Sequence, residues 1–314
     1  MSRPSADRPG PPDTRRGPDD ATGEPSAAGA ERRRRTVLFS LVAALLVGAL
    51  GVAWVQRSGS DDPPEFEVLG WLPYWVAEDG LASLERAGGE LSVVSPFWFV
   101  ALGPTTILAD DHADPAETEA AMAAARASGA AVVPSILDGM DAGGMAAILR
   151  DPATRSVHVD AVIGFVEDNG FDGVDLDYEQ FAFADDRSTW EATRPAWVSF
   201  VEELSAELHR RGKVLHVSVP PVYDDGRTAN SGYWVYDHGA IIAVVDRLRI
   251  MTYDYSPGAP GPIAPIDWVV SSLDGTIEAT GSRPPRPGNP LYGYNWFVGT
   301  TGSCAEPGTP AGPR

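Results

Sequence analysis

The sequence predicts an α/β fold, a (β/α)8 TIM barrel that lacks a recognisable eighth strand and follows an N-terminal transmembrane helix. Three observations lead to this prediction. Short apolar segments alternate with helical segments from residue 66 onward, which is typical of a parallel sheet covered by helices. About 240 residues of this pattern fit the size of such a barrel. Twenty residues without a charge, 36–55, precede it.

The N-terminal region is expected to lie outside the folded domain. Residues 1–35 are rich in Pro, Gly, Ala, Asp and Arg and predict a disordered cytoplasmic tail. Residues 36–55 are long enough to cross a bilayer, and four arginines directly before them place the N-terminus inside the cell. A signal anchor and an extracellular barrel are therefore predicted. The alternative is a cleaved signal peptide, which would release a secreted protein. Residues 56–65 are expected to form a linker.

Composition excludes several classes of function. The net charge is −20, whereas nucleic-acid binding requires clustered Lys and Arg, so no nucleic-acid partner is expected. Cys304 is the only cysteine, which excludes an internal disulfide and any multi-cysteine metal site. We expect neither a cofactor nor a metal ion.

Seven segments are predicted as strands because they are short, apolar and bounded by turn residues. They are Glu67–Trp75, Leu91–Val100, Ala130–Leu137, Gly173–Glu179, Lys213–Val219, Arg247–Tyr253 and Pro290–Tyr294. A doubly wound sheet is the alternative arrangement, but no Gly-rich phosphate-binding turn follows the first segment. The barrel is expected to cover residues 66–298, and 299–314 to form an irregular tail.

Three helices between these strands have clear boundary signals. Asp114 and Asp151 each precede a proline, which is the usual beginning of a capped helix. A third helix is predicted over 194–211 from apolar residues at three-to-four spacing, with Gly212 closing it. The stretch 180–193 before it is expected to be a loop at the barrel mouth that carries aromatic side chains.

The most distinctive segment for chemistry is FDGVDLDYE, residues 171–179. Alternate side chains of a strand share a face, so three acids are expected to point into the barrel and three apolar residues toward the helices. The acids are Asp175, Asp177 and Glu179, and the apolar residues are Val174, Leu176 and Tyr178. Carboxylates about 6.6 Å apart repel by roughly 2.5 kcal/mol at an effective dielectric near 20. The row should therefore hold a proton near neutral pH, and Glu179 is the expected proton donor.

Two structural alternatives compete with a catalytic role for this row. A single buried acid is usually explained by an ion pair, but three alternating acids without a function would be costly. A metal site made of the acids is the second alternative. It lacks support because the five histidines, His112, His158, His209, His216 and His238, form no pair at ligand spacing. His216 is expected to fill the barrel interior with a hydrogen bond.

The same segment resembles the signature of glycoside hydrolase family 18, Asp-Gly-x-Asp-x-Asp-x-Glu. Asp172, Gly173, Asp175, Asp177 and Glu179 match every fixed place. Other segments resemble the family in the same order, namely GWLPYW at 70–75, SPFW at 95–98, MTYD at 251–254, PIAPIDW at 262–268 and PLYGYNW at 290–296. SPFW and PIAPIDW are more similar to the spore-germination branch. The resemblance covers residues 66 to about 298.

The resemblance implies an exported retaining glycosidase that cleaves β-linked N-acetylhexosamine polymers, peptidoglycan or chitin-like, by substrate-assisted catalysis. By this analogy Glu179 protonates the glycosidic oxygen and later activates the water. The acetamido carbonyl of the substrate itself is the nucleophile. Asp177 would hold the acetamide N–H and stabilise the positive oxazolinium intermediate, sharing its proton with Asp175.

The resemblance also implies a binding site around these acids. Tyr253 would hydrogen-bond the acetamide oxygen, and Met251 and Asp254 would shape the same subsite. Tyr74 and Trp296, at the ends of the first and seventh predicted strands, are the expected sugar contacts. The presence of Glu179 and Tyr253 favours an enzyme over the alternative, a non-catalytic lectin-like protein on the same barrel.

One departure from the family pattern concerns the end of the chain. The family closes its barrel with an eighth strand whose final Trp forms the floor of the cleavage subsite. After Trp296 this sequence is rich in Gly and Pro and poor in β-formers. We therefore expect either a truncation or a partner that completes the barrel, and activity of this chain would depend on which holds.

Overall fold

The computed structural model describes residues 67–227, 231–281 and 286–288, all within the compact unit Phe66–Arg314. Several predictions fall outside these ranges: the tail 1–35, the anchor 36–55, the linker 56–65, the seventh strand 290–294, Trp296 and the tail 299–314. Within the described ranges, no helix has the length and apolar character needed to span a bilayer.

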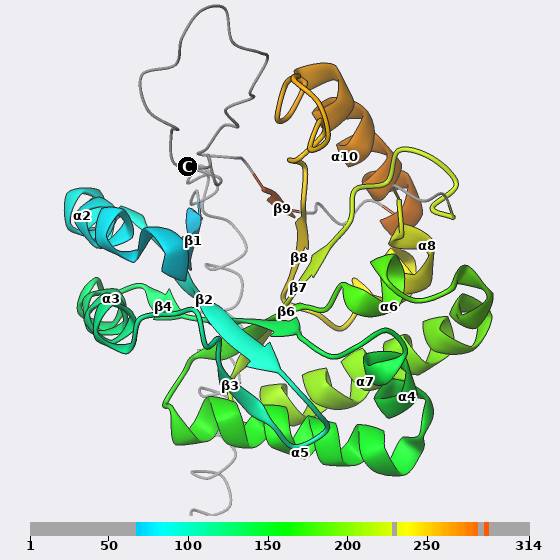
Figure 1. Cartoon of the computed structure of the whole chain (residues 1–314), viewed down its shortest axis with the longest axis horizontal. Helices are drawn as coiled ribbons and strands as arrows, with labels where there is room; N and C mark the ends of the chain where they lie inside the picture. The colour runs from blue at the N-terminus through cyan, green and yellow to red at the C-terminus, as the bar shows by residue number, and fades with distance from the viewer. Residues whose placement is uncertain (1–66, 228–230, 282–285, 289–314) are drawn as a thin grey trace, which may run out of the picture. The chain divides into compact units, whose positions relative to one another are not determined.

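The described strands form one curved sheet whose main path is parallel throughout (Figure 1). The strands of this path follow each other in chain order. They are β1 (Leu69–Pro73), β2 (Val93–Ala101), β5 (Ser135–Asp138), β6 (Gly173–Asp177), β7 (Val214–Val219), β8 (Arg247–Ile250) and β9 (Arg286–Pro287). Sequential parallel neighbours require a crossover outside the sheet each time, which is the construction of a (β/α) barrel. The predicted α/β class with a curved parallel sheet is confirmed.

Two short strands extend this sheet beside β2. β3 (Ile107–Ala109) pairs with β2 antiparallel, and β4 (Ala131–Val132) pairs with it parallel. The prediction of a single strand over 130–137 is thus wrong, since this segment forms two strands, β4 and β5, with Pro134 between them. Proline has no N–H to donate to a ladder, although the Pro134 carbonyl still accepts from the Asp175 N–H at 2.9 Å.

Three of the predicted strands end earlier than expected at the carboxyl edge of the sheet. β1 gives way to a 3-10 turn, η1 (Tyr74–Val76), and β8 ends at Ile250. β6 ends at Asp177, so Glu179 follows the strand rather than belonging to it. At Glu179 the backbone N–H donates to the Asp138 carboxylate at 2.6 Å. A side-chain acceptor has replaced the ladder there, and the chain turns away from the sheet.

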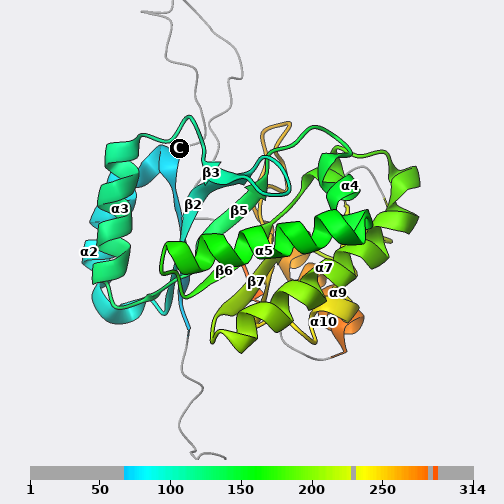
Figure 2. The same cartoon turned by 90° about the horizontal axis from the view of Figure 1, so that it is seen from below.

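Helices cover the outer side of the sheet. The long ones are α2 (Ala77–Ala87), α3 (Pro115–Ala127), α4 (Gly144–Arg150), α5 (Pro152–Asp168), α7 (Trp190–Arg210) and α10 (Ile266–Thr280). Figure 2 shows α5 and α7 side by side across the outer side of β6 and β7. The predicted caps are confirmed, because the Asp114 and Asp151 carboxylates accept backbone N–H groups in the first turns of α3 and α5.

The predicted mouth loop 180–193 is wrong. It contains the short helix α6 (Gln180–Phe183), the 3-10 turn η3 (Arg187–Thr189) and the first turn of α7. The reason is burial: the Trp190 side chain is 2% exposed, and its Nε1 donates to the Phe181 carbonyl. The short helices α8 (Tyr233–Tyr236) and α9 (His238–Ile241) follow β7.

The outer face of β6 packs on these helices as the alternation predicts. Val174, Leu176 and Tyr178 have no exposed surface. The Tyr178 hydroxyl lies 2.8 Å from Nε2 of His158 on α5, and its ring stacks on Phe200 of α7. Since the apolar side chains of this strand face the helices, Asp175 and Asp177 are directed into the curve of the sheet.

Candidate active site

Asp175 is a buried carboxyl group on the sheet's inner face. Its side chain has no exposed surface and accepts hydrogen bonds from four side chains on four other strands. The donors are Trp71 Nε1 at 3.3 Å, Ser135 Oγ at 2.6 Å, Ser218 Oγ at 3.1 Å and Arg249 Nη1 at 3.0 Å. This carboxylate therefore joins β1, β5, β7 and β8 to β6.

Arg249 is the cation of this cluster and was not predicted. It lies on β8 with 2% of its surface exposed, and its guanidinium stacks 3.6 Å from the centre of the Trp71 ring. The sequence contains a signal for it. In Arg247–Ile250 arginines alternate with Leu and Ile, and this is the same period-two pattern that marks the acids of β6.

Asp177, one step further along the inner face, has different surroundings. It is 7% exposed, and its Oδ1 makes no hydrogen bond to any described residue. Burial raises the pKa of Asp177 well above its usual range, and the charges of Glu179 and Asp175 raise it further. The charge of Arg249 acts in the opposite direction. The surroundings of Asp177 thus favour its neutral, protonated form more than those of an ordinary aspartate do.

Glu179 lies at the carboxyl edge of the sheet, directly after β6. Burial, followed by the charge of Asp254, raises its pKa to about 7. A carboxyl group with this pKa can donate a proton at neutral pH and take one back, as acid–base catalysis requires. The predicted proton held within the acid row agrees with the raised pKa values of Asp177 and Glu179.

Asp138, the last residue of β5, holds the backbone at Glu179 and was missed by the sequence analysis. Its Oδ1 accepts from the Glu179 N–H at 2.6 Å, and its Oδ2 accepts from the Gln180 N–H at 3.0 Å. The Asp138 side chain is 4% exposed, and burial raises its pKa to about 7. A single acid within an otherwise apolar strand gives no local signal, because its role depends on which strand lies beside it.

The predicted binding residues after β8 are brought to the same region. The Tyr253 ring meets the Trp71 ring edge-on, with centroids 6.3 Å apart. Asp254 adopts φ = 57°, a left-handed conformation that Asp tolerates better than most residues, and its charge acts on Glu179. Met251 lies at the start of this turn, where its N–H donates to the Val219 carbonyl of β7 at 3.0 Å.

Tyr74 lies in the turn after β1, next to a more exposed aromatic residue. Its ring meets that of Trp75 edge-on at 5.1 Å, and Trp75, which is 51% exposed, meets Phe97 in the same way at 5.8 Å. Burial and then the charges of Asp110 and Asp111 raise the Tyr74 pKa, so its hydroxyl stays protonated. The other predicted sugar contact, Trp296, lies outside the described residues.

Several aromatic residues near the mouth belong to the packing of the domain. Phe181 is completely buried, and its ring packs against Trp197 of α7. Trp234 of α8 has two guanidinium groups over its ring, from Arg227 at 3.7 Å and Arg194 at 4.4 Å. A ring stacked by arginines is not available as a sugar platform.

His216 of β7 lies inside the curve of the sheet, as expected from its place in the predicted strand. It is 3% exposed, and burial lowers its pKa to about 4, so it is neutral near pH 7. The expected hydrogen bond is not found at Nδ1, which has no partner among the described residues.

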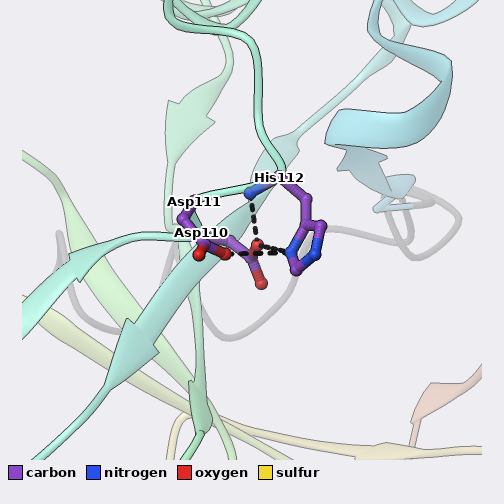
Figure 3. A group of neighbouring side chains, drawn as sticks. All are labelled: Asp110, Asp111 and His112. Carbon is purple, nitrogen blue, oxygen red and sulfur yellow. Dashed lines mark hydrogen bonds and ion pairs between the residues drawn. The ribbon is translucent and has the colours of Figure 1, made fainter.

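One group of side chains with metal-ligand chemistry is found among the described residues, at Asp110, Asp111 and His112 (Figure 3). The His112 Nδ1 lies 2.8 Å from the Asp110 carboxylate and 2.9 Å from that of Asp111. The hydrogen bond to Asp110 raises the His112 pKa, which favours an ion pair with a protonated imidazole over a neutral metal ligand. A surface hollow of about 490 Å³ beside these residues is lined by none of the acids on β6.

Comparisons with known proteins agree with this site. The model of glycosyl hydrolases family 18 matches residues 92–293, more than half of the chain. A Bacillus subtilis protein that bears the name of a sporulation-specific glycosylase, YdhD, is 34% identical over 155 residues, which are 48% of this chain and 34% of that protein. A chitinase structure from Chromobacterium violaceum has a TM-score of 0.60 and 25% identity, over 73% of this chain and 69% of the other.

A further structure, the Bacillus cereus spore cortex-lytic enzyme SleL, shares the fold with a TM-score of 0.59 and 21% identity, over 75% of this chain and 52% of that one. Taken together with the acid row, these matches define a glycoside hydrolase. The chain belongs to glycoside hydrolase family 18. It spans about a third of the length of YdhD.

Proposed function

We propose that the protein hydrolyses β-linked N-acetylhexosamine polymers with retention of configuration, using the acetamido group of the substrate as nucleophile. The observation that carries this proposal is the pair of raised pKa values on two acids that are two residues apart: Asp177, and Glu179 at about 7. Two such acids at the carboxyl edge of a parallel sheet occupy the position at which barrel enzymes build their active sites.

In this proposal Glu179 donates its proton to the glycosidic oxygen as the bond to the anomeric carbon breaks. The acetamido carbonyl oxygen forms the new bond to that carbon, and Asp177 stabilises the positive ring that results. Glu179 then removes a proton from water, whose oxygen bonds to the anomeric carbon as the bond from that carbon to the acetamido oxygen breaks. The proton taken from water restores the acid. Tyr253 and Asp254 lie close to these acids. The Tyr253 ring contacts Trp71, and the charge of Asp254 acts on Glu179.

Peptidoglycan is the favoured substrate and chitin is the second candidate. The names of YdhD and SleL refer to sporulation and to the spore cortex, whereas the Chromobacterium structure is named a chitinase. The proposed location outside the cell, through residues 36–55 as an anchor, also favours the wall. Fractionation of cells that express the full chain, with protease added to intact cells, tests that location.

The deciding experiment compares the full chain with Glu179→Gln and with a matched control, Glu203→Gln. Glu203 lies on α7 in a partly exposed pair with Arg155. Release of reducing ends from peptidoglycan and from a chitin oligomer is measured, and the anomer formed first is identified by NMR. Glu179→Gln should reduce turnover by about 10²–10⁴-fold, and Glu203→Gln should not. Sugar binding without turnover in the unchanged protein would favour the lectin-like alternative.

A further inference from the structure

We propose that Arg249 is a positioning residue for this reaction, because its pairing with Asp175 keeps that carboxylate ionised and leaves Asp177 and Glu179 as the acids that hold protons. The proposal rests on the proposed function for its catalytic meaning. Its structural content, the charge state of Asp175, is measurable without any substrate.

The contacts of Arg249 fix its guanidinium in one place. Nη1 donates to Asp175 Oδ2 at 3.0 Å and to Ser95 Oγ at 2.8 Å. The face of the group lies on the Trp71 ring, and the indole N–H of that ring donates to the same Asp175 oxygen. Arginine and tryptophan together thus hold one carboxylate oxygen from two directions.

The hydrogen-bonding groups around Asp175 favour an anion. Indole and guanidinium N–H groups can only donate, so Oδ2 faces two donors that cannot accept a proton from it. Ser135 donates to Oδ2 as well, and Ser218 donates to Oδ1. A proton on Oδ2 would face the N–H groups of Trp71 and Arg249.

The other titratable and charged groups near Asp175 do not supply it with a positive charge. From β7, His216 faces the site as a neutral imidazole, since burial lowers its pKa to about 4. Asp177 on β6 adds negative charge only when it is ionised, and an ionised Tyr253, after β8, would raise the pKa of Arg249. Arg247 lies two residues before Arg249 on β8 but forms its ion pair with Glu67. Among the described side chains, Arg249 is therefore the cation in contact with Asp175.

The consequence for the reaction follows from the order of the acids along β6. With Asp175 fixed as an anion, a proton entering the row resides on Asp177 or Glu179, which are the groups next to the substrate in the proposed mechanism. Without Arg249, the row would bind protons more tightly, and Asp175 would compete for them. Both limbs of the pH profile of kcat/KM would then move to higher pH.

The first test is a ¹³C NMR titration of the carboxyl groups in the full chain, with Arg249→Met, Arg249→Lys and the control Arg247→Met. Loss of a cation at this distance should raise the midpoint of the Asp175 carboxyl by about 1–3 pH units in Arg249→Met. Arg249→Lys should restore most of the difference, and Arg247→Met should leave the midpoint in place. An unchanged Asp175 titration in Arg249→Met would overturn the proposal.

A second variant covers the case in which Arg249→Met does not fold. Ser218→Ala removes one donor to Asp175 without changing the charge, so its midpoint should rise by a fraction of a unit while Arg249 keeps the group ionised. If the Asp175 midpoint rises in Ser218→Ala by about the same 1–3 pH units that are expected for Arg249→Met, hydrogen bonding accounts for the effect. That result would overturn the role of Arg249.

The pH profile of reducing-end release then tests the link to catalysis. Both limbs should move upward in Arg249→Met and return in Arg249→Lys, whereas a purely structural role would lower kcat at every pH without moving the limbs. If the unchanged protein shows no turnover on either polymer, the proposed function fails. The carboxyl titration still decides the charge state of Asp175 in that case.

Discussion

Asp175 and Asp177 stand two residues apart on the inner face of β6, and their surroundings differ. Asp175 accepts hydrogen bonds from four side chains and pairs with a buried arginine. Asp177 has one carboxylate oxygen without a partner among the described residues, and burial raises its pKa. The same residue type on the same strand thus faces four donors, one of them a cation, at one level, and lacks a full set of partners at the next.

This difference shows that the charge of an inward acid is decided by the neighbouring strands. The donors to Asp175 come from β1, β5, β7 and β8, all of which converge at one depth of the sheet. At the carboxyl edge the strands end, and the acids there face the open side where a substrate can enter. The inner level stabilises the fold, and the outer level remains available for proton transfer.

The largest expected effect comes from breaking the inner level with Asp175→Asn. This change leaves the Arg249 charge buried without its anion, which typically costs about 3–5 kcal/mol of unfolding free energy. The double variant Asp175→Asn with Arg249→Met should lose less than the single variant, because no unpaired charge remains. Chemical denaturation of the full-length variants measures both values. A double variant that is less stable than Asp175→Asn would contradict this account of the ion pair.

The matching change at the outer level, Asp177→Asn, should separate activity from stability. Asn imitates the neutral acid that the raised pKa favours, so the free energy of unfolding at pH 7 should not fall and is expected to rise slightly. Turnover should fall by about 10²–10³-fold, since Asn cannot ionise to stabilise the positive intermediate. Denaturation and reducing-end release on the same sample provide the comparison. A variant destabilised as much as Asp175→Asn would erase the distinction between the two levels.

The sequence predicted the parts of this site that lie on one local pattern. Alternation in FDGVDLDYE placed Asp175 and Asp177 on the inner face and Tyr178 against the helices, and all three positions are found there. The caps at Asp114 and Asp151 were predicted for the same reason, because a cap is read from neighbouring residues.

The parts that were missed depend on which distant strands become neighbours. Asp138 acts on Glu179 only because β5 lies beside β6, and Arg249 reaches Asp175 from β8 across β7. Local patterns cannot supply this register. The alternation of Arg247 and Arg249 with apolar residues did indicate inward cations, but not which acid they would meet.

A pH-dependent prediction tests Asp138, which has a raised pKa although it also accepts two backbone hydrogen bonds. Between its ordinary pKa of 3.8 and its folded value of about 7, the folded protein keeps a proton that the unfolded chain has lost. The stability of the folded state therefore falls as the pH rises through this window. Asp138→Asn keeps one acceptor oxygen, which can accept from both Glu179 and Gln180 as Oδ1 does, but it does not titrate.

The difference in unfolding free energy, variant minus unchanged protein, should accordingly be near zero at pH 4. It should rise to about 2–4 kcal/mol above pH 7. Burial lowers the pKa of His216 and His238 to about 4. These two residues therefore reduce the stability of the folded state as the pH falls, which is opposite to the effect of Asp138. Their effect is the same in both proteins and cancels in the difference. A difference that stays constant across this pH range would show that Asp138 is ionised throughout.

The smallest expected effect concerns the aromatic residues at the end of β1, which lie outside both levels of acids. If Tyr74 contacts the sugar through its ring, Tyr74→Ala should raise KM for a chitin oligomer by about 2–10-fold, the value of one aromatic contact, and leave kcat nearly unchanged. Tyr74→Phe keeps the ring and should behave like the unchanged protein. Trp75, whose ring is 51% exposed, provides the competing candidate through Trp75→Ala. If KM rises only in Trp75→Ala, the sugar contact is made by Trp75 and not by Tyr74. The acid row would keep its roles, because neither ring takes part in holding Asp175, Asp177 or Glu179.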